Sequence, residues 1–237
     1  MPRVRLFLDQ PLSGGETVTL DRDRSHYLLN VMRMGEGDAL EVFDGRTGAY
    51  SATLRDARRK GAVLTLGDMA HPLRVPPDLW LLFAPIKKAR TDFIVEKAAE
   101  LGARRILPVR TELTNSDRVR VDRLQAHAVE AAEQCGGTFV PEVGEMAQLS
   151  AVLGGWEAER TLVFCNEGLA GPSAGWDSVP PGPAAILVGP EGGFSDAERG
   201  WIGRMGHPVS LGPRILRADT AAVAALTLWQ DRFGDWG

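Results

Sequence analysis

Four largely apolar runs in the last two thirds of the chain constrain the fold most strongly. They are residues 79–84, 105–109, 161–165 and 184–189. A run without regular polar alternation is typical of a strand that is covered on both faces of a parallel sheet. Between these runs, residues 92–101 and 121–134 carry Ile, Val, Leu and Ala at helical spacing. Alternating strands and helices predict an α/β domain.

The first 70 residues follow a different pattern, with short stretches in which apolar and polar residues alternate. This period of two indicates half-buried strands at residues 4–8, 17–20, 39–43, 49–54 and 62–66. Asp44 and Gly45 supply a turn. One helix is expected at residues 25–32, with its larger apolar side chains on one face: Tyr27, Leu28, Val31 and Met32. The region predicts a small barrel-like β domain.

A proline-rich stretch separates the two patterns. Residues 71–78 contain Pro72, Pro76 and Pro77, which favour extended backbone and exclude a helix. We therefore expect two domains, residues 1–72 and residues 73–237.

Charge and hydropathy exclude several classes of protein. The net charge of the 237 residues is −4, and all of it falls after residue 72, because the first 72 residues carry ten basic and ten acidic side chains. This balance argues against a protein that coats nucleic acid without selection, but it allows a local basic patch. No apolar stretch approaches the ~18 residues that a spanning helix needs, and the first residues lack a secretory signal. A cytoplasmic protein with no membrane partner is expected.

The cysteines and histidines do not form a recognisable metal or disulfide pattern. Cys135 and Cys165 are far apart, with no second pair, and the four histidines are scattered without ligand spacing. No metal is expected, and neither cysteine is assigned a chemical role.

Residues 189–194 form the first candidate ligand loop. This glycine loop, Gly-Pro-Glu-Gly-Gly-Phe, follows a buried strand and precedes the capping-box pattern of Ser195 and Glu198, which predicts a helix start. Glycines allow a ligand to approach the backbone, and a helix N-terminus offers free N–H donors. The loop matches neither the ATP-binding nor the NAD-binding glycine pattern. A simple tight turn is the alternative.

A second loop of similar character follows the next short strand. Residues 210–220 contain a Gly-Pro turn, and then Ile215 and Leu216 between Arg214 and Arg217. Apolar residues held in a loop can line the binding site of a flat heterocycle such as adenine. The alternative is that Ile215 and Leu216 pack into the core while both arginines are solvated.

The two loops together, GPEGGFSDAE and SLGPRILRADTA, resemble the bacterial 16S ribosomal RNA uridine-N3 methyltransferases of the knotted SPOUT superfamily. Residues 24–34, 97–102 and 130–135 match further segments of that family, so the resemblance spans nearly the whole chain. Two departures are visible. Gly137 stands where many members have Arg, and Asp219 stands where many have Glu.

The resemblance implies a trefoil-knotted α/β SPOUT methyltransferase domain with a mostly parallel sheet, preceded by a PUA-like β-barrel domain that binds RNA. It implies S-adenosylmethionine as cofactor, and ribosomal RNA or the assembled small ribosomal subunit as partner. It further implies a homodimer, for which we expect Leu226, Leu228 and Trp229 of the last helix to offer more apolar surface than one monomer needs. The expected reaction is methylation of N3 of a uridine.

The resemblance also implies site residues. The expected cofactor-binding residues are Phe164, Asn166, Glu167, Leu187, Val188, Gly189, Pro190, Gly192, Gly193, Leu211, Gly212, Ile215, Leu216 and Arg217. Loss of the N3 proton requires a base and a stabiliser of negative charge. The candidate bases are Glu191, Glu167 and Asp219, and the candidate stabilisers are Arg217 and Arg214. The expected RNA-binding residues are Arg3, Arg22, Arg24, Arg33, Lys87, Lys88 and Arg90, with Arg5 and Arg46 as further candidates.

The sequence also allows other functions. The chain can be a methyltransferase for another RNA position or for a ribose 2′-hydroxyl, or a non-catalytic RNA-binding or ribosome-assembly protein of the same fold. A nucleotide-dependent oxidoreductase is disfavoured because its glycine fingerprint is absent.

Overall fold

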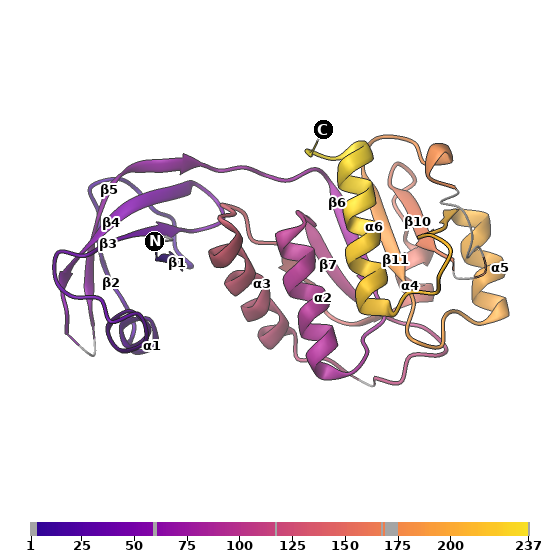
Figure 1. Cartoon of the computed structure of the whole chain (residues 1–237), viewed down its shortest axis with the longest axis horizontal. Helices are drawn as coiled ribbons and strands as arrows, with labels where there is room; N and C mark the ends of the chain where they lie inside the picture. The colour runs from indigo at the N-terminus through magenta and orange to yellow at the C-terminus, as the bar shows by residue number, and fades with distance from the viewer. Residues whose placement is uncertain (1–3, 59–60, 117, 167, 169–174, 237) are drawn as a thin grey trace. The chain divides into compact units, whose positions relative to one another are not determined.

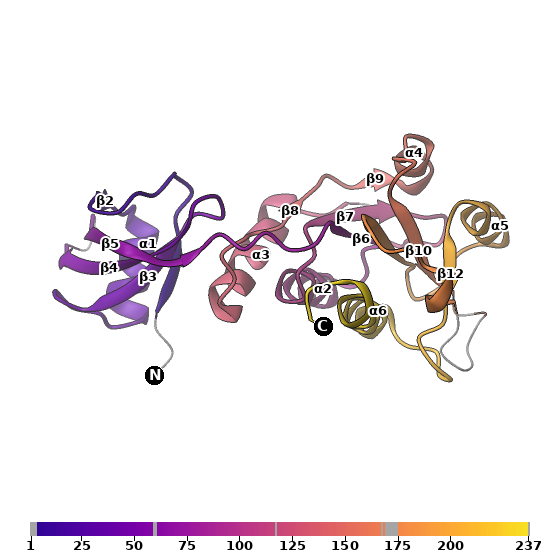
Figure 2. The ribbon, with the colours of Figure 1, turned by 90° about the horizontal axis from the view of Figure 1, so that it is seen from above.

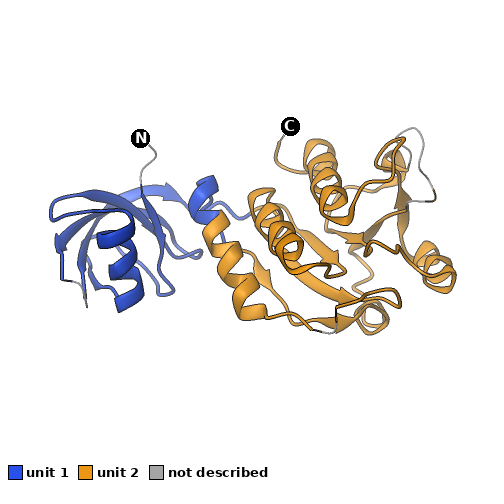
Figure 3. Ribbon diagram, turned by 60° about the horizontal axis from the view of Figure 1, so that its bottom comes forward, with its two compact units in different colours: residues 1–75, 132–140 blue, residues 76–131, 141–237 orange. Residues whose placement is uncertain are grey.

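The computed structural model describes residues 4–58, 61–116, 118–166, 168 and 175–236, and divides into two compact units (Figure 1, Figure 3). The first unit comprises Met1–Val75 and Ala132–Val140, and the second comprises Pro76–Ala131 and Pro141–Gly237. Among the described residues, no helix combines the length and the apolar character needed to cross a lipid bilayer.

The first unit is built on a curled five-stranded sheet with strand order β1-β3-β4-β5-β2. Among its described residues, only the β1–β3 pair is parallel. Its core is formed by the inward-facing residues of these strands, including Val42, Leu54 and Leu64. The elements are β1 (Arg5–Phe7), β2 (Thr17–Thr19), α1 (Arg22–His26), η1 (Tyr27–Val31), β3 (Ala39–Phe43), β4 (Gly48–Asp56) and β5 (Val63–Pro72).

The helix expected at residues 25–32 differs from the prediction. The α-helix ends at His26 and continues as a π-helical turn, in which the Met32 N–H donates to the Tyr27 carbonyl at 2.9 Å. Leu28 is fully buried, but Val31 and Met32 are 59% and 39% exposed. The expected common face is therefore wrong: Tyr27 and Leu29 pack on the core beside Leu28, whereas Val31 and Met32, at the end of the wider π-helical turn, do not.

Residues 132–140 complete the first unit, although they are distant from it in sequence. The Arg5 guanidinium donates to the carbonyls of Ala132 and Gly137, both at 2.9 Å, and pairs with Glu41 at 2.7 Å. The backbone N–H of Phe7 donates to Glu133 Oε1 at 2.8 Å. The Arg5 side chain is only 10% exposed. Arg5 is thus an internal anchor, and the expectation that it contacts RNA is wrong.

The proline-rich stretch begins later than expected. Strand β5 continues to Pro72, where His71 and Pro72 pair with Ala49 and Gly48. Gly48 has a φ of +126°, and a side chain there would collide with the His71 carbonyl, so only glycine fits this bulged end of the ladder.

The second unit contains a sheet in which every strand pair is parallel, with order β12-β10-β11-β6-β7-β8 and β9 paired to β7. This confirms the predicted α/β class with a parallel sheet, while the trefoil knot stays a prediction. The strands are β6 (Leu79–Phe83), β7 (Arg105–Arg110), β8 (Glu142–Val143), β9 (Ala147–Gln148), β10 (Thr161–Cys165), β11 (Ala184–Val188) and β12 (His207–Val209).

Helices cover both faces of this sheet (Figure 2). α2 and α6 pack on each other, and α6 contacts β11. On the opposite face, side chains of α4 and α5 join those of β10 and β11 in one core cluster, including Leu153, Ile202, Phe164 and Leu187. The helices are α2 (Lys88–Glu100), α3 (Val121–Cys135), α4 (Leu149–Gly154), η3 (Trp176–Ser178), α5 (Asp196–Met205) and α6 (Ala218–Phe233).

One buried arginine joins the starts of two strands at the amino edge of this sheet. Arg160 precedes β10, and its guanidinium forms two 3.0 Å bonds with the carboxylate of Asp78, which precedes β6. The guanidinium also stacks on the Trp80 ring, 3.7 Å from the ring centroid. The Arg160 side chain is 6% exposed, so its charge is removed from water and is compensated by this pairing. Hydrogen bonds from Arg160 lower the pKa of the Asp78 carboxyl below its ordinary value of 3.8.

We expect Asp78→Ala to lower the free energy of unfolding by about 2–3 kcal/mol, because it leaves Arg160 buried without its bidentate partner. Urea denaturation measures the change. The control is Glu157→Ala, which removes the exposed second partner of Arg160 and should cost less than about 1 kcal/mol.

The same pair predicts a pH dependence. Because the pKa of Asp78 is lower in the folded state than in the unfolded state, its stabilisation is present above about pH 4 and is lost as the pH falls through the folded-state pKa. The difference between wild type and Asp78→Asn should shrink over that range. In the urea experiment, equal losses of unfolding free energy for Asp78→Ala and Glu157→Ala would contradict the role of Asp78 as the main partner of Arg160.

Candidate functional site

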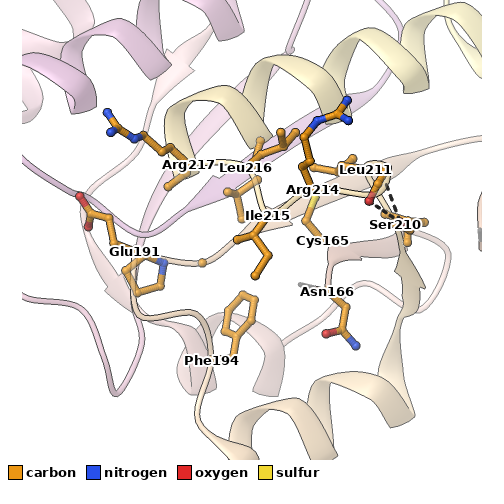
Figure 4. Close-up of a pocket in the computed structure, with 17 residues that line it drawn as sticks. Cys165, Asn166, Glu191, Phe194, Ser210, Leu211, Arg214, Ile215, Leu216 and Arg217 are labelled. Carbon is orange, nitrogen blue, oxygen red and sulfur yellow. Dashed lines mark hydrogen bonds between the residues drawn. The ribbon is translucent and has the colours of Figure 1, made fainter. Parts of the chain in front are cut away.

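A pocket of about 210 Å³ lies at the carboxyl edge of the parallel sheet (Figure 4). The loops that line it follow β10, β11 and β12, whose carboxyl ends meet at this edge because the strands are parallel. The lining residues are Cys165, Asn166, Val188, Gly189, Pro190, Glu191, Phe194, Val209, Ser210, Leu211, Gly212, Arg214, Ile215, Leu216, Arg217, Ala218 and Ala221.

The glycine loop is both a tight turn and a wall of this pocket. Gly193 has a φ of +67°, and its N–H donates to the Pro190 carbonyl at 2.9 Å. A Cβ at Gly189 would lie 3.1 Å from the Phe194 ring, so a side chain there would displace the ring from the pocket wall. Gly192 is less restricted, because a Cβ there would make ordinary contact with Leu113 at 3.5 Å.

The predicted capping box holds the end of this loop. The Ser195 hydroxyl accepts from the Glu198 N–H, and Glu198 Oε2 accepts from the Ser195 N–H at 3.0 Å. The other carboxylate oxygen of Glu198 accepts from the Glu112 N–H at 2.9 Å. Glu198 is 4% exposed. One buried carboxylate therefore fixes the start of α5 and joins it to the loop after β7.

The loop after β12 presents an apolar side chain to the pocket. Ile215 is 76% exposed and points across the pocket toward the Phe194 ring (Figure 4). The alternative in which Ile215 packs into the core is therefore wrong. The loop begins at Ser210, whose carbonyl accepts from the Trp176 indole N–H at 3.1 Å and whose hydroxyl accepts from the Gly212 N–H at 3.2 Å.

The structure brings together most of the expected cofactor residues. Those that line the pocket are Asn166, Val188, Gly189, Pro190, Leu211, Gly212, Ile215, Leu216 and Arg217. Four others do not line it. Phe164 and Leu187 face the core cluster beneath α4 and α5, and Gly192 and Gly193 lie in the loop outside the pocket lining. Glu167 lies outside the described residues.

Two lining residues, Cys165 and Val209, lie outside both predicted ligand loops. The alternation of side chains along a strand explains why Cys165 and Val188 reach the pocket. Since Phe164 and Leu187 face one core, the next residues, Cys165 and Val188, point elsewhere and reach the pocket. Burial raises the pKa of the Cys165 thiol to about 12. This pocket thiol is therefore protonated at neutral pH.

The three expected catalytic residues are in two environments. Glu191 and Arg217 line the pocket. Asp219 does not. Its carboxylate is 3.7 Å from Arg90 Nη1 and accepts from the Thr220 N–H at 2.8 Å, so it joins α6 to α2.

The expected RNA-binding residues also differ in availability. Arg22, Arg33, Lys87 and Lys88 are exposed. Arg24 is half-buried, pairs with Asp21 and donates to the Phe7 carbonyl at 3.2 Å. Arg3 lies outside the described residues. Over the described part of the chain, no group of His, Cys, Asp or Glu side chains is arranged to hold a metal ion.

Two protein-family models match the chain. An RNA methyltransferase domain matches residues 74–230, and an RNA methyltransferase PUA domain matches residues 20–67. The matched segments lie in the α/β and curled-sheet regions respectively.

Named relatives agree with these models. Ribosomal RNA small subunit methyltransferase E from Synechocystis sp. is 33% identical over 89% of this chain and 71% of its own length. The crystal structure of Ribosomal RNA small subunit methyltransferase E from Neisseria gonorrhoeae, bound to S-adenosyl methionine, has a TM-score of 0.91 at 29% identity, over 99% of this chain and 100% of that one. A putative methyltransferase from Legionella pneumophila in complex with the same cofactor has a TM-score of 0.90 at 27% identity, with the same coverage.

The pocket of three loops at the carboxyl edge of a parallel sheet thus occurs in a chain that matches these proteins over almost its whole length. The protein belongs to the Ribosomal RNA small subunit methyltransferase E family.

Proposed function

We propose that this protein transfers the methyl group of S-adenosylmethionine to N3 of a uridine in 16S ribosomal RNA. The observation that carries the proposal is the pocket lined by the loops after β10, β11 and β12, in a fold whose relatives bind this cofactor. Ribosomal RNA of a bacterium lies in the cytoplasm, so the proposed activity implies a cytoplasmic location.

The pocket residues fit the cofactor. Gly189 and Gly212 line it without side chains, and a Cβ at Gly212 would stand in open space with a φ of +112°. Ile215 and Phe194 face each other across the pocket and can enclose the flat adenine ring. Ser210 and Asn166 add polar groups to the lining. When bound, S-adenosylmethionine supplies an electrophilic methyl group on its sulfonium centre.

Transfer to N3 requires that the uracil ring loses its imide proton and that the resulting charge on the ring oxygens is stabilised. Glu191 is the only carboxylate among the described residues that line the pocket, and we assign it to accept the proton. Arg217 and Arg214 also line the pocket, and their guanidinium groups can stabilise the charge. We assign this role to Arg217. We assign Asp219, which pairs with Arg90, to positioning the start of α6.

The test is methylation of 16S ribosomal RNA from a strain lacking this modification, with labelled cofactor and mass mapping of the product. We expect one 3-methyluridine. Gly189→Val should weaken cofactor binding at least tenfold in calorimetry, because its side chain would displace Phe194. The matched control is Gly192→Ala. Its added methyl group would contact Leu113 outside the pocket lining, so this variant should bind the cofactor normally.

Glu191→Gln completes this test. It should bind the cofactor normally but transfer methyl about 10²-fold more slowly, as expected when a general base is lost. A product methylated at another base or at a ribose would contradict the proposed substrate. Normal binding by Gly189→Val would contradict the assigned cofactor site.

We also propose that the first unit contacts RNA through exposed arginines. Arg22 and Arg33 are exposed, whereas Arg24 is already paired with Asp21. Replacing Arg22 and Arg33 together by Ala should weaken RNA binding and reduce its dependence on salt concentration, while cofactor affinity stays unchanged. Filter binding at several salt concentrations measures both effects. Unchanged RNA affinity with weakened cofactor binding would contradict this assignment.

We propose that the protein is a homodimer. The support differs from the apolar last helix on which the sequence analysis based this expectation. Of the three side chains expected to offer apolar surface on α6, Leu226 and Trp229 are 0% and 1% exposed within the single chain, and only Leu228 is partly accessible. Apolar side chains remain exposed elsewhere in the second unit, at Phe93 of α2 and Ile215 of the pocket loop.

Sedimentation at micromolar concentration should give about twice the 25.6 kDa mass of one chain. Phe93→Ser should favour the monomer because it removes exposed apolar surface. A 25.6 kDa species in the wild type at that concentration would contradict the dimer.

A further inference from the structure

A second cavity, of about 260 Å³, lies in the same unit and shares no residue with the pocket described above. Its walls come from the end of β7, the junction of β9 and α4, and α5. The lining residues are Arg110, Thr111, Glu112, Gln148, Ser150, Glu198 and Trp201. Because β7 is parallel to β6 and β6 to β11, this cavity lies at the same carboxyl edge of the sheet as the first pocket.

The two cavities share one structural support. The segment from Glu191 to Glu198 lines the first pocket at its beginning and the second cavity at its end. Glu198 accepts from the backbone of Glu112 and of Ser195, and Leu113 lies against Gly192. A ligand in the second cavity would therefore lie beside the glycine loop that lines the cofactor pocket.

The chemistry of the second cavity suits a planar, neutral, hydrogen-bonding group. Trp201 packs partly on the core cluster and is half-buried, so its indole ring is held in place by its neighbours. Arg110 supplies a guanidinium plane. Gln148 and Ser150 are exposed polar side chains at the rim, and Glu112 is an exposed carboxylate.

The charges of the lining argue against a phosphate. Glu112 and Glu198 place two carboxylates against the one guanidinium of Arg110. Both oxygens of Glu198 already accept backbone N–H groups, but the Glu112 side chain has no such bond among those found in the described part of the chain. A carboxylate in this position accepts N–H groups of a base edge, and indole and guanidinium planes stack on bases.

We propose that this cavity binds a nucleobase of the substrate RNA that neighbours the methylated uridine and is unstacked from the helix. The inference rests on the proposed function, since it requires that RNA is the substrate. Unpaired bases in RNA are read in this way, by stacking and by hydrogen bonds to their edges. The base in the second cavity would fix the position of the target uridine relative to the glycine loop.

The first test is steady-state methyl transfer by the full-length Glu112→Ala/Gln148→Ala double variant. Both side chains are exposed, and the bond from Glu112 to Glu198 uses the backbone N–H, so the fold is retained. We expect KM for 16S ribosomal RNA to rise about tenfold, while calorimetry with S-adenosylmethionine gives the wild-type Kd. Glu145→Ala removes the same charge from an exposed residue outside the cavity, and it should leave KM unchanged.

The second test is ultraviolet cross-linking of the wild-type protein to the same RNA, followed by trypsin digestion. Cleavage after Arg199 and after Arg204 releases the peptide of residues 200–204, which contains Trp201 and should carry one cross-linked nucleotide. The double variant should lose this cross-link. Trp201→Phe keeps an aromatic ring and should keep a KM close to that of the wild type.

The outcomes separate the inference from the proposed function. If the wild type methylates RNA, a double variant with the KM of Glu145→Ala would overturn the inference alone. A lower KM in the double variant would also overturn it, because it would indicate that the carboxylate repels a phosphate. If the wild type methylates no RNA but binds S-adenosylmethionine, the proposed substrate fails, and the inference fails with it.

Discussion

The parallel pairing of the second unit's sheet is the constraint on which the rest of its structure depends. Because β10, β11 and β12 run in one direction, the loops that follow them are brought to one edge, although the first and the last are separated by more than 40 residues of sequence. Backbone donors, apolar walls and charged side chains can then converge there. An antiparallel sheet would divide the same loops between two opposite edges.

The two edges of this sheet are stabilised in different ways. At the amino edge, the buried Arg160 guanidinium pairs with Asp78 and stacks on Trp80, both half-buried, and it joins the starts of β6 and β10. At the carboxyl edge, the buried carboxylate of Glu198 organises the loops through backbone N–H groups. Each edge therefore depends on one buried charged side chain, Arg160 at the amino edge and Glu198 at the carboxyl edge.

The sequence predicted those features that depend on local signals. Strands at residues 39–43 and 161–165 were predicted with the observed bounds, because apolar patterning marks them directly. The glycine loop and its capping box were also visible. The short elements β8, β9 and α4 were not predicted, since they have too few residues to show a period. Pocket residues such as Cys165 and Val209 depend on which strands become neighbours, and no local pattern contains that information.

The membership of residues 132–140 in the first unit has a consequence for how this chain can be divided. Ala132 and Val140 pack with Phe43 and Ala49, and Arg5 is bonded to the backbone of the same segment. A polypeptide ending at the proline-rich stretch would expose that apolar cluster and leave the Arg5 guanidinium without its carbonyl partners. The first unit is therefore complete only when the chain, after leaving it at the proline-rich stretch, returns to it at residues 132–140.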